Sequence, residues 1–75
     1  MARKAAAASS IARVTEVIST SDKSFEDAVS NGVKRASKTL RGIRGAWVKE
    51  MKVDVENGKI TSYRVDMLVT FVVED

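Results

Sequence analysis

The stretch AWVKEMKVDVENGKITSYRVDMLVTFVV, residues 46–73, carries a Glu56-Asn57-Gly58-Lys59 sequence between two runs rich in apolar and β-branched residues. Asn-Gly is a preferred pair for a two-residue type I′ turn, in which both central residues have positive φ. The flanking runs largely follow the two-residue period of half-buried strands. The stretch therefore predicts a β-hairpin of two long strands, residues 46–55 and 60–73.

Counting outward from the turn predicts which residues of the two strands lie opposite each other. The predicted pairs are Val55 with Ile60, Met51 with Arg64, Lys49 with Asp66, Val48 with Met67 and Trp47 with Leu68. One face of the last strand is then nearly all apolar and is expected to pack on a helix: Tyr63, Val65, Met67, Val69, Phe71 and Val73. The opposite face is mixed: Trp47, Lys49, Met51, Arg64, Asp66, Leu68, Thr70 and Val72. An exposed patch of this kind indicates a subunit interface or a ligand site.

The upstream half of the chain predicts one strand and one helix. Residues 13–18 alternate and are rich in β-branched residues, which favours a strand, and residues 19–22 form a turn cluster. Ser24 is a candidate helix N-cap with Asp27 three residues later, and Gly42 is a candidate stop. The helix would present one apolar face: Phe25, Ala28, Val29, Gly32, Val33, Ala36 and Leu40. The expected fold is α+β with the order β-α-β-β.

The length of 75 residues allows one domain, which we expect at residues 11–75 behind a flexible N-terminal arm, residues 1–10. A domain of this size is marginal on its own, and without Cys or His it has no disulfide or thiolate and imidazole metal site. Self-association is therefore expected. No apolar segment is long enough to span a bilayer, so we expect a cytoplasmic protein with no membrane partner.

The charge gives little support to nucleic-acid binding. The chain has 13 basic and 10 acidic residues, and two of the basic ones, Arg3 and Lys4, lie in the predicted arm. The remaining domain is close to neutral, unlike a typical nucleic-acid-binding domain. A basic nucleic-acid-binding module stays as a third hypothesis, to be tested by the salt dependence of any binding.

Several strings in the chain resemble the dodecin family, in their order and spacing. They are TEVISTS (residues 15–21), SFEDA (24–28), KRASKTLR (34–41), and YRV through VTF (63–65 and 69–71). The resemblance covers roughly residues 11–75. It implies a three-stranded antiparallel sheet wrapped around one helix, with twelve copies forming a hollow shell, a homododecamer. It also implies a non-enzymatic protein that stores flavin, FMN or riboflavin, at inter-subunit sites.

Two positions depart from the pattern of the flavin-binding dodecins. The resemblance implies a stacking tryptophan at Gly45, whereas Trp47 stands two residues later on the same face, a shift of about 7 Å. It implies a glutamine at Arg64, and a guanidinium donates hydrogen bonds but cannot accept them. The chain is also similar to a dodecin subgroup that lacks this tryptophan and is linked to calcium. The candidate flavin-binding residues are Trp47, Arg64, Gly45 and Arg44.

Each candidate residue also has an alternative role. Trp47 could fill a subunit contact, and Arg64 could pair with Asp66 or with an acid of a neighbouring subunit. A basic group could hold a phosphate of FMN or coenzyme A or simply face solvent: Lys34, Arg35, Lys38, Arg41 and Arg44. Asp54, Glu56 and Asn57 could contribute to a calcium site or serve only the turn. The alternative function is a dodecin-like assembly that holds calcium, a coenzyme-A-like anion or no ligand.

No catalytic residue is predicted. The chain has no His or Cys, no serine with a base nearby, no glycine-rich phosphate loop, and no predicted pair of carboxylates on one face. We therefore expect a binding protein and not an enzyme.

Overall fold

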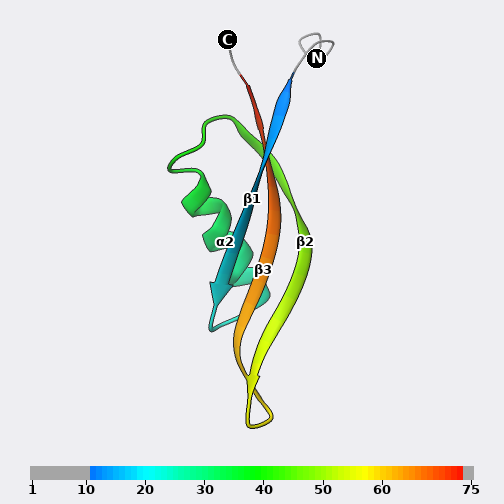
Figure 1. Ribbon diagram of the computed structural model, residues 1–75. Helices are drawn as coiled ribbons and strands as arrows, with labels where there is room; N and C mark the ends of the chain where they lie inside the picture. Colours follow the sequence, from blue (N-terminus) through cyan, green and yellow to red (C-terminus); the bar gives the residue numbers. More distant parts are fainter. Residues whose placement is uncertain (1–10, 74–75) are drawn as a thin grey trace.

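The structure is a computed structural model and describes residues 11–73 (Figure 1). Its elements are β1 (Ala12–Ser21), α2 (Phe25–Ala36), β2 (Ile43–Glu56) and β3 (Lys59–Val72). The strands form one antiparallel sheet in the order β1-β3-β2, and α2 lies against one face of it. The predicted α+β fold with β-α-β-β order is confirmed. The predicted arm, residues 1–10, lies outside the described residues.

The β2–β3 hairpin closes at the turn that the sequence predicts. Asn57 and Gly58 have φ values of 52° and 78°, and Val55 and Glu56 pair with Ile60 and Lys59. Positive φ at both positions is what a type I′ turn requires. The long hairpin extends past the N-terminal start of α2, so that the molecule measures 54 × 20 × 18 Å (Figure 1).

The predicted register is correct at both ends of the hairpin and wrong in the middle. Met51 lies opposite Val65 and not Arg64, and Glu50 lies opposite Asp66 in place of Lys49. One β-bulge adds a residue to β3 between Ser62 and Ile60, and a second adds Lys49 to β2, so the two shifts cancel before Val48 and Trp47. Met51 therefore turns to the helix side of the sheet and Glu50 to the other side.

Element boundaries differ from the prediction around the helix. β1 continues through Ser21, because residues 19–21, predicted as a turn, pair with β3. Ser24 is the N-cap, as predicted, and its Oγ accepts a hydrogen bond from the Asp27 amide at 2.9 Å. The Asp27 carboxylate instead accepts from Ser21 Oγ at 2.6 Å, which ties the helix start to β1.

The helix ends at Ala36, earlier than its apolar pattern predicts. Ser37 Oγ donates to the Val33 carbonyl at 2.9 Å, and the Thr39 and Leu40 amides both donate to the Ala36 carbonyl. These bonds close tight turns that replace a further helical turn. The chain then reverses at Gly42, where φ is +73°, and enters β2 at Ile43.

The core lies where α2 crosses β1 and β3. Ala28, Val65 and Met67 are fully buried, and four partly buried side chains surround them: Val17, Phe25, Val29 and Val33. Phe25 meets Tyr63 edge to face, with 5.1 Å between ring centroids. The apolar face predicted for β3 is therefore the core face, as the alternation indicates.

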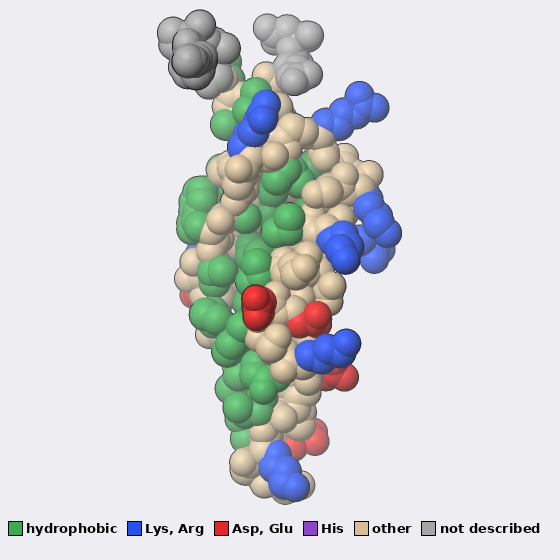
Figure 2. Space-filling model, turned by 180° about the vertical axis from the view of Figure 1, so that it is seen from behind, with side chains coloured by type: hydrophobic (Ala, Val, Ile, Leu, Met, Phe, Trp, Pro, Cys, Tyr) green, Lys and Arg blue, Asp and Glu red, His purple; other side chains and the backbone are tan. Residues whose placement is uncertain are grey.

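Strand β2 is left largely uncovered, because the helix contacts β1 and β3. By strand alternation, four exposed apolar residues follow the helix side of the hairpin. They are Val48, Met51, Val55 and Ile60, here called the uncovered strip. Hydrophobic side chains run along much of the molecule toward the hairpin end in Figure 2. A continuous apolar surface of this kind marks an interaction site.

Gly42→Ala is expected to lower the free energy of unfolding by about 1–2 kcal/mol, because a left-handed backbone disfavours a Cβ. The new Cβ would also lie 3.2 Å from the Val72 carbonyl oxygen. Denaturant unfolding at one fixed protomer concentration measures the loss. Gly45→Ala is the matched control, since its Cβ would meet only Thr70 Oγ1 at 3.7 Å. Equal stability of the two variants would contradict the argument.

Candidate functional site

The candidate residues lie on or next to the sheet face that points away from α2, here called the outer face. Pairing across β1, β3 and β2 arranges this face in four successive rows. They are Val14-Thr70-Gly45, Glu16-Leu68-Trp47, Ile18-Asp66-Glu50 and Thr20-Arg64-Lys52. The first two rows are mainly apolar or small, and the last two carry most of the charge.

Trp47 stands at the apolar end of the outer face. Its side chain is 51% exposed and lies beside Leu68 in the same row. Gly45 is two residues away on the same strand, and a Cβ at this position would meet only Thr70 Oγ1, at 3.7 Å. Thr70 Oγ1 donates to the Gly45 carbonyl at 3.1 Å and holds this edge of the sheet. Trp47 and Gly45, both predicted site residues, thus form one open shelf.

Arg64 lies at the charged end, separated from the Trp47 row by four residues of β3, about 13 Å along the strand. Its Nη2 is 3.9 Å from Asp54 Oδ2, so its described ion-pair partner is Asp54 and not Asp66, which the sequence suggested. Arg64 also helps to line a cavity of about 170 Å³ with Ile18, Glu50, Lys52 and Asp66. Within one chain, the structure does not bring Arg64 into contact with Trp47.

Arg44, the fourth predicted residue, is the extra residue of a third bulge, between Ile43 and Gly45. It is exposed at the Trp47 end of β2. The basic group predicted around it is also divided. Lys34, Arg35 and Lys38 line a shallow cavity of about 220 Å³ on α2, and Arg41 lies in the following loop. The five basic residues are therefore not one phosphate site within a single chain.

Three carboxylates share the outer face, contrary to the prediction that no two would do so. Glu16 and Asp66 occupy adjacent rows on β1 and β3, and the bulge at Lys49 brings Glu50 beside Asp66. Lys49 Nζ lies 3.4 Å from Glu16 Oε2, which replaces its predicted pairing with Asp66. The sequence does not predict this group of carboxylates, because counting residues from the hairpin turn reveals neither the β1–β3 register nor the bulge at Lys49.

Glu16 and Asp66 titrate as a pair. A hydrogen bond shared with Glu16 raises the pKa of Asp66 above its ordinary value, and desolvation and the Glu16 charge add to this. The same hydrogen bond and the neighbouring Lys49 lower the pKa of Glu16. Asp66 Oδ1 is buried and has no donor among the described residues. Asp66 is therefore the member of the pair that retains a proton to higher pH.

Asp66→Asn is expected to stabilise the protein at pH 7, because an amide can donate to Glu16 without adding a second charge. A raised carboxyl pKa makes stability fall as pH rises from the unfolded value through the folded one. The variant should lose this part of the pH dependence, and the thermal midpoint measured from pH 3 to pH 8 tests it. A lower midpoint for the variant at pH 7 would contradict the shared proton.

Asp54→Asn is the matched control with the opposite sign. A hydrogen bond from Ser62 Oγ, 2.6 Å from Asp54 Oδ2, lowers the pKa of Asp54, and the charges of Arg64 and Lys52 act the same way. A lowered carboxyl pKa contributes stability above the unfolded value and loses it as pH falls. Asp54→Asn should therefore lower the midpoint at pH 7 and have little effect under strongly acidic conditions.

Metal-binding geometry is not formed by the acidic residues of one chain. Among residues 11–73, no group of three or more His, Cys, Asp or Glu is arranged to hold an ion. Of the predicted calcium ligands, Asp54 is engaged by Ser62, while Glu56 is exposed and Asn57 forms the turn. A calcium ion, which takes six or more oxygens, would need water or another subunit to complete its shell.

No helix among the described residues is long and apolar enough to cross a membrane.

The fold and the outer face define a small β-α-β-β protein with exposed apolar surfaces on both sides of its sheet. The sequence profile of the Dodecin family matches residues 11–74. This chain belongs to the dodecin family. The resemblance noted in the sequence is thereby confirmed.

Individual dodecins match over most of their length. Calcium dodecin of Mycobacterium tuberculosis is 40% identical over 63 residues, which cover 83% of this chain and 87% of that protein. The structure of a dodecin from Streptomyces davaonensis is 32% identical with a TM-score of 0.83, covering 88% of this chain and 97% of that one. The Mycobacterium tuberculosis calcium dodecin structure, described as calcium chelating, is 35% identical with a TM-score of 0.73, covering 85% and 91%.

Proposed function

We propose that this protein assembles into a hollow dodecamer that sequesters flavin, FMN or riboflavin, at sites between subunits. Membership of the dodecin family supports the assembly. So do the apolar surfaces that one chain leaves open, namely the uncovered strip and the Trp47 end of the outer face. A chain of 75 residues has little core of its own and gains stability when such surfaces are buried.

The observation that carries the flavin proposal is the half-exposed Trp47 beside the open shelf at Gly45. An indole face stacks well, with an offset, on another flat π-system. The missing side chain at Gly45 leaves space for a ring that extends past Trp47. Trp47 thus stacks on the flavin in place of the tryptophan that the family pattern implies at position 45. It lies two residues further along the same face.

The charged end of the outer face, presented by a neighbouring subunit, suits the polar edge of the flavin ring. That edge presents both acceptors and a donor, which Arg64 alone cannot match because a guanidinium only donates. Asp66, one row closer to Trp47, lines the same cavity as Arg64 and supplies a carboxyl group that accepts. Asp66 and Arg64 together offer what a single amide side chain would offer. Binding of this kind stores the ligand and requires no catalytic group.

A titration of riboflavin and of FMN with the purified protein tests the proposal. Flavin and Trp47 emission are recorded together, and assembly size is measured on the same samples. We expect mutual quenching that saturates at a fixed ratio of flavin to protomer. Unchanged emission of both chromophores, with a large assembly intact, would reject flavin binding and leave the assembly in place.

Calcium is the second candidate, favoured by the 40% identity to a calcium dodecin. Asp54, Glu56 and the outer-face acids would supply oxygens, completed by a neighbouring subunit or by water. Calcium at one hundred times its dissociation constant should stabilise the folded protein by about 2.7 kcal/mol. Thermal unfolding of chelator-treated protein with calcium, and with magnesium as the control ion, measures this. No shift with calcium would reject this candidate.

A further inference from the structure

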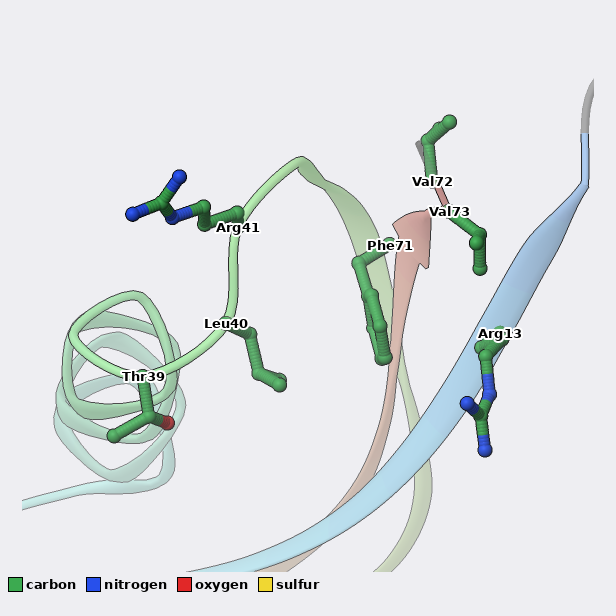
Figure 3. A pocket seen from close by; sticks show the side chains of 7 residues that line it. All are labelled: Arg13, Thr39, Leu40, Arg41, Phe71, Val72 and Val73. Atoms are coloured by element: carbon green, nitrogen blue, oxygen red, sulfur yellow. The ribbon is translucent and has the colours of Figure 1, made fainter. Parts of the chain in front are cut away.

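A cavity of about 520 Å³ lies on the helix side of the sheet, between the loop after α2 and the ends of β1 and β3 (Figure 3). It is lined by Arg13, Thr39, Leu40, Arg41, Phe71 and Val73, and by Val72. Arg13 pairs with Phe71 in the β1–β3 ladder, so both lie on the opposite side of the sheet from Trp47. This cavity is therefore separate from the outer face.

Apolar side chains form one part of the cavity lining, beside Thr39 and the two arginines. Leu40 extends from the loop and Phe71 from β3, and the two side chains point into the gap from opposite sides (Figure 3). Both are only partly buried, and Val73 adds a further apolar surface. A volume of this size falls within the range of small-ligand pockets.

The charged groups at the cavity are all positive among the described residues. The Arg13 guanidinium extends from β1 at one side, and Arg41 leaves the loop at the other, with its head directed away from the gap (Figure 3). The negative end of the α2 dipole is nearby, but its last carbonyls are occupied. The Val33 carbonyl accepts from the Ser37 amide at 2.9 Å, and that of Ala36 accepts from Thr39 and Leu40. The field in the cavity is therefore set mainly by the arginines.

Backbone hydrogen bonds hold the walls of the cavity in place. The Val72 amide donates to the Gly42 carbonyl at 3.0 Å, which fixes the loop after α2 to β3. The Val73 amide donates to the Ile11 carbonyl at 2.9 Å, which fixes the end of β3 to the start of β1. Because these walls are already ordered, binding of a ligand costs less conformational entropy than binding to a mobile loop would.

We propose that this cavity binds a small amphiphilic anion, with an apolar body between Leu40 and Phe71 and a carboxylate, sulfonate or phosphate group against Arg13. The apolar walls recognise the body through the hydrophobic effect, and the guanidinium pairs with the anionic group in two-point geometry. Arg41, whose head is directed away from the gap, adds a second positive charge at the rim of the cavity. The site goes beyond flavin storage and does not depend on it.

Anilinonaphthalene sulfonate tests the site, because its fluorescence rises in apolar surroundings and it carries one anionic group. N-phenylnaphthylamine has the same ring system without the sulfonate and is the neutral control. We expect saturable binding of the sulfonate to the folded assembly, weakened by salt, since the ion pair is near the surface. Absence of binding by the assembled protein would overturn the proposal.

Two variants separate the charge from the apolar wall. Arg13→Gln should weaken sulfonate binding about fivefold, the value of a favourable surface ion pair, and leave N-phenylnaphthylamine unaffected. Leu40→Gln should weaken both probes about tenfold or more, because it removes apolar contact and places an amide in the cavity. Circular dichroism and assembly size verify that each variant is folded.

Lys38→Gln and Met51→Gln are the matched controls. Lys38 is a basic residue of the turn that follows α2, and Met51 is an exposed apolar residue of the uncovered strip. Neither residue lines the cavity. Both should keep the affinity of the unaltered protein. If Met51→Gln weakens the probe while Arg13→Gln and Leu40→Gln do not, the probe binds the strip and the proposal is overturned.

Discussion

Met67→Ala is expected to lower the free energy of unfolding by about 2–5 kcal/mol, the range for emptying a buried methionine site. Met67 is fully buried at the centre of the core, between Val65 and Ala28. Its Cε occupies the space that a side chain at position 32 would need, and Gly32 leaves that space open. The rigid β3 backbone and α2 cannot both move inward to fill the cavity. In a domain of this size, such a loss is a large part of the total stability.

Denaturant unfolding at one fixed protomer concentration measures the effect, because assembly makes stability depend on concentration. Met67→Leu is the control. It conserves volume and should cost less than about 1.5 kcal/mol. If Met67→Ala unfolds within about 0.5 kcal/mol of the unaltered protein, the α2–β3 contact does not hold the fold together, since only surface changes are that mild.

Met67 also illustrates what the sequence could predict. Its place on an alternating apolar face, counted from the Asn57-Gly58 turn, is enough to assign it to the core. The turn chemistry, the helix cap at Ser24 and the apolar face of the helix are likewise local signals, and the structure contains all three. Local signals of this kind depend on a few neighbouring residues, so one sequence is sufficient to interpret them.

The features that the sequence could not predict depend on pairing between distant segments. The bulges between Ile60 and Ser62 and at Lys49 leave no trace in composition. They turn Met51 to the helix side of the sheet and Glu50 to the outer face. The β1–β3 register brings Glu16 beside Asp66 across fifty residues of sequence. A bulge is stabilised by sheet twist and by side-chain contacts that form only in the folded sheet.

The candidate site shows both situations. Trp47 is on the predicted face because the two bulges cancel before it, and Gly45 follows it by simple alternation. Arg64 is also on that face, but its ion-pair partner is Asp54, which lies opposite the bulge in β3, and not the nearby Asp66. The places of Trp47, Gly45 and Arg64 on the outer face were therefore predictable, whereas the contacts of these residues were not.

Trp47→Ala is expected to weaken riboflavin binding about 5- to 150-fold, the range found when an aromatic residue that stacks on a nucleobase is removed. Trp47 is 51% exposed and offers a flat surface. Its neighbour on the same face, Gly45, has no side chain to cover it. Its removal takes away the stacking partner but creates no cavity in the core. Flavin emission must be the signal, since the variant has lost the only tryptophan.

Trp47→Phe is the control that separates stacking from packing. A smaller ring still stacks, so the Phe variant should bind riboflavin with an affinity between those of Trp47 and Ala. The proposed dodecamer should survive in both variants when they are compared by size-exclusion chromatography. If Trp47→Ala instead dissociates into small species, the indole is a subunit contact and the stacking role is wrong. If the assembly persists and riboflavin binds both variants as tightly as before, the flavin lies elsewhere on the shell, and the outer-face acids become the stronger reason to test calcium.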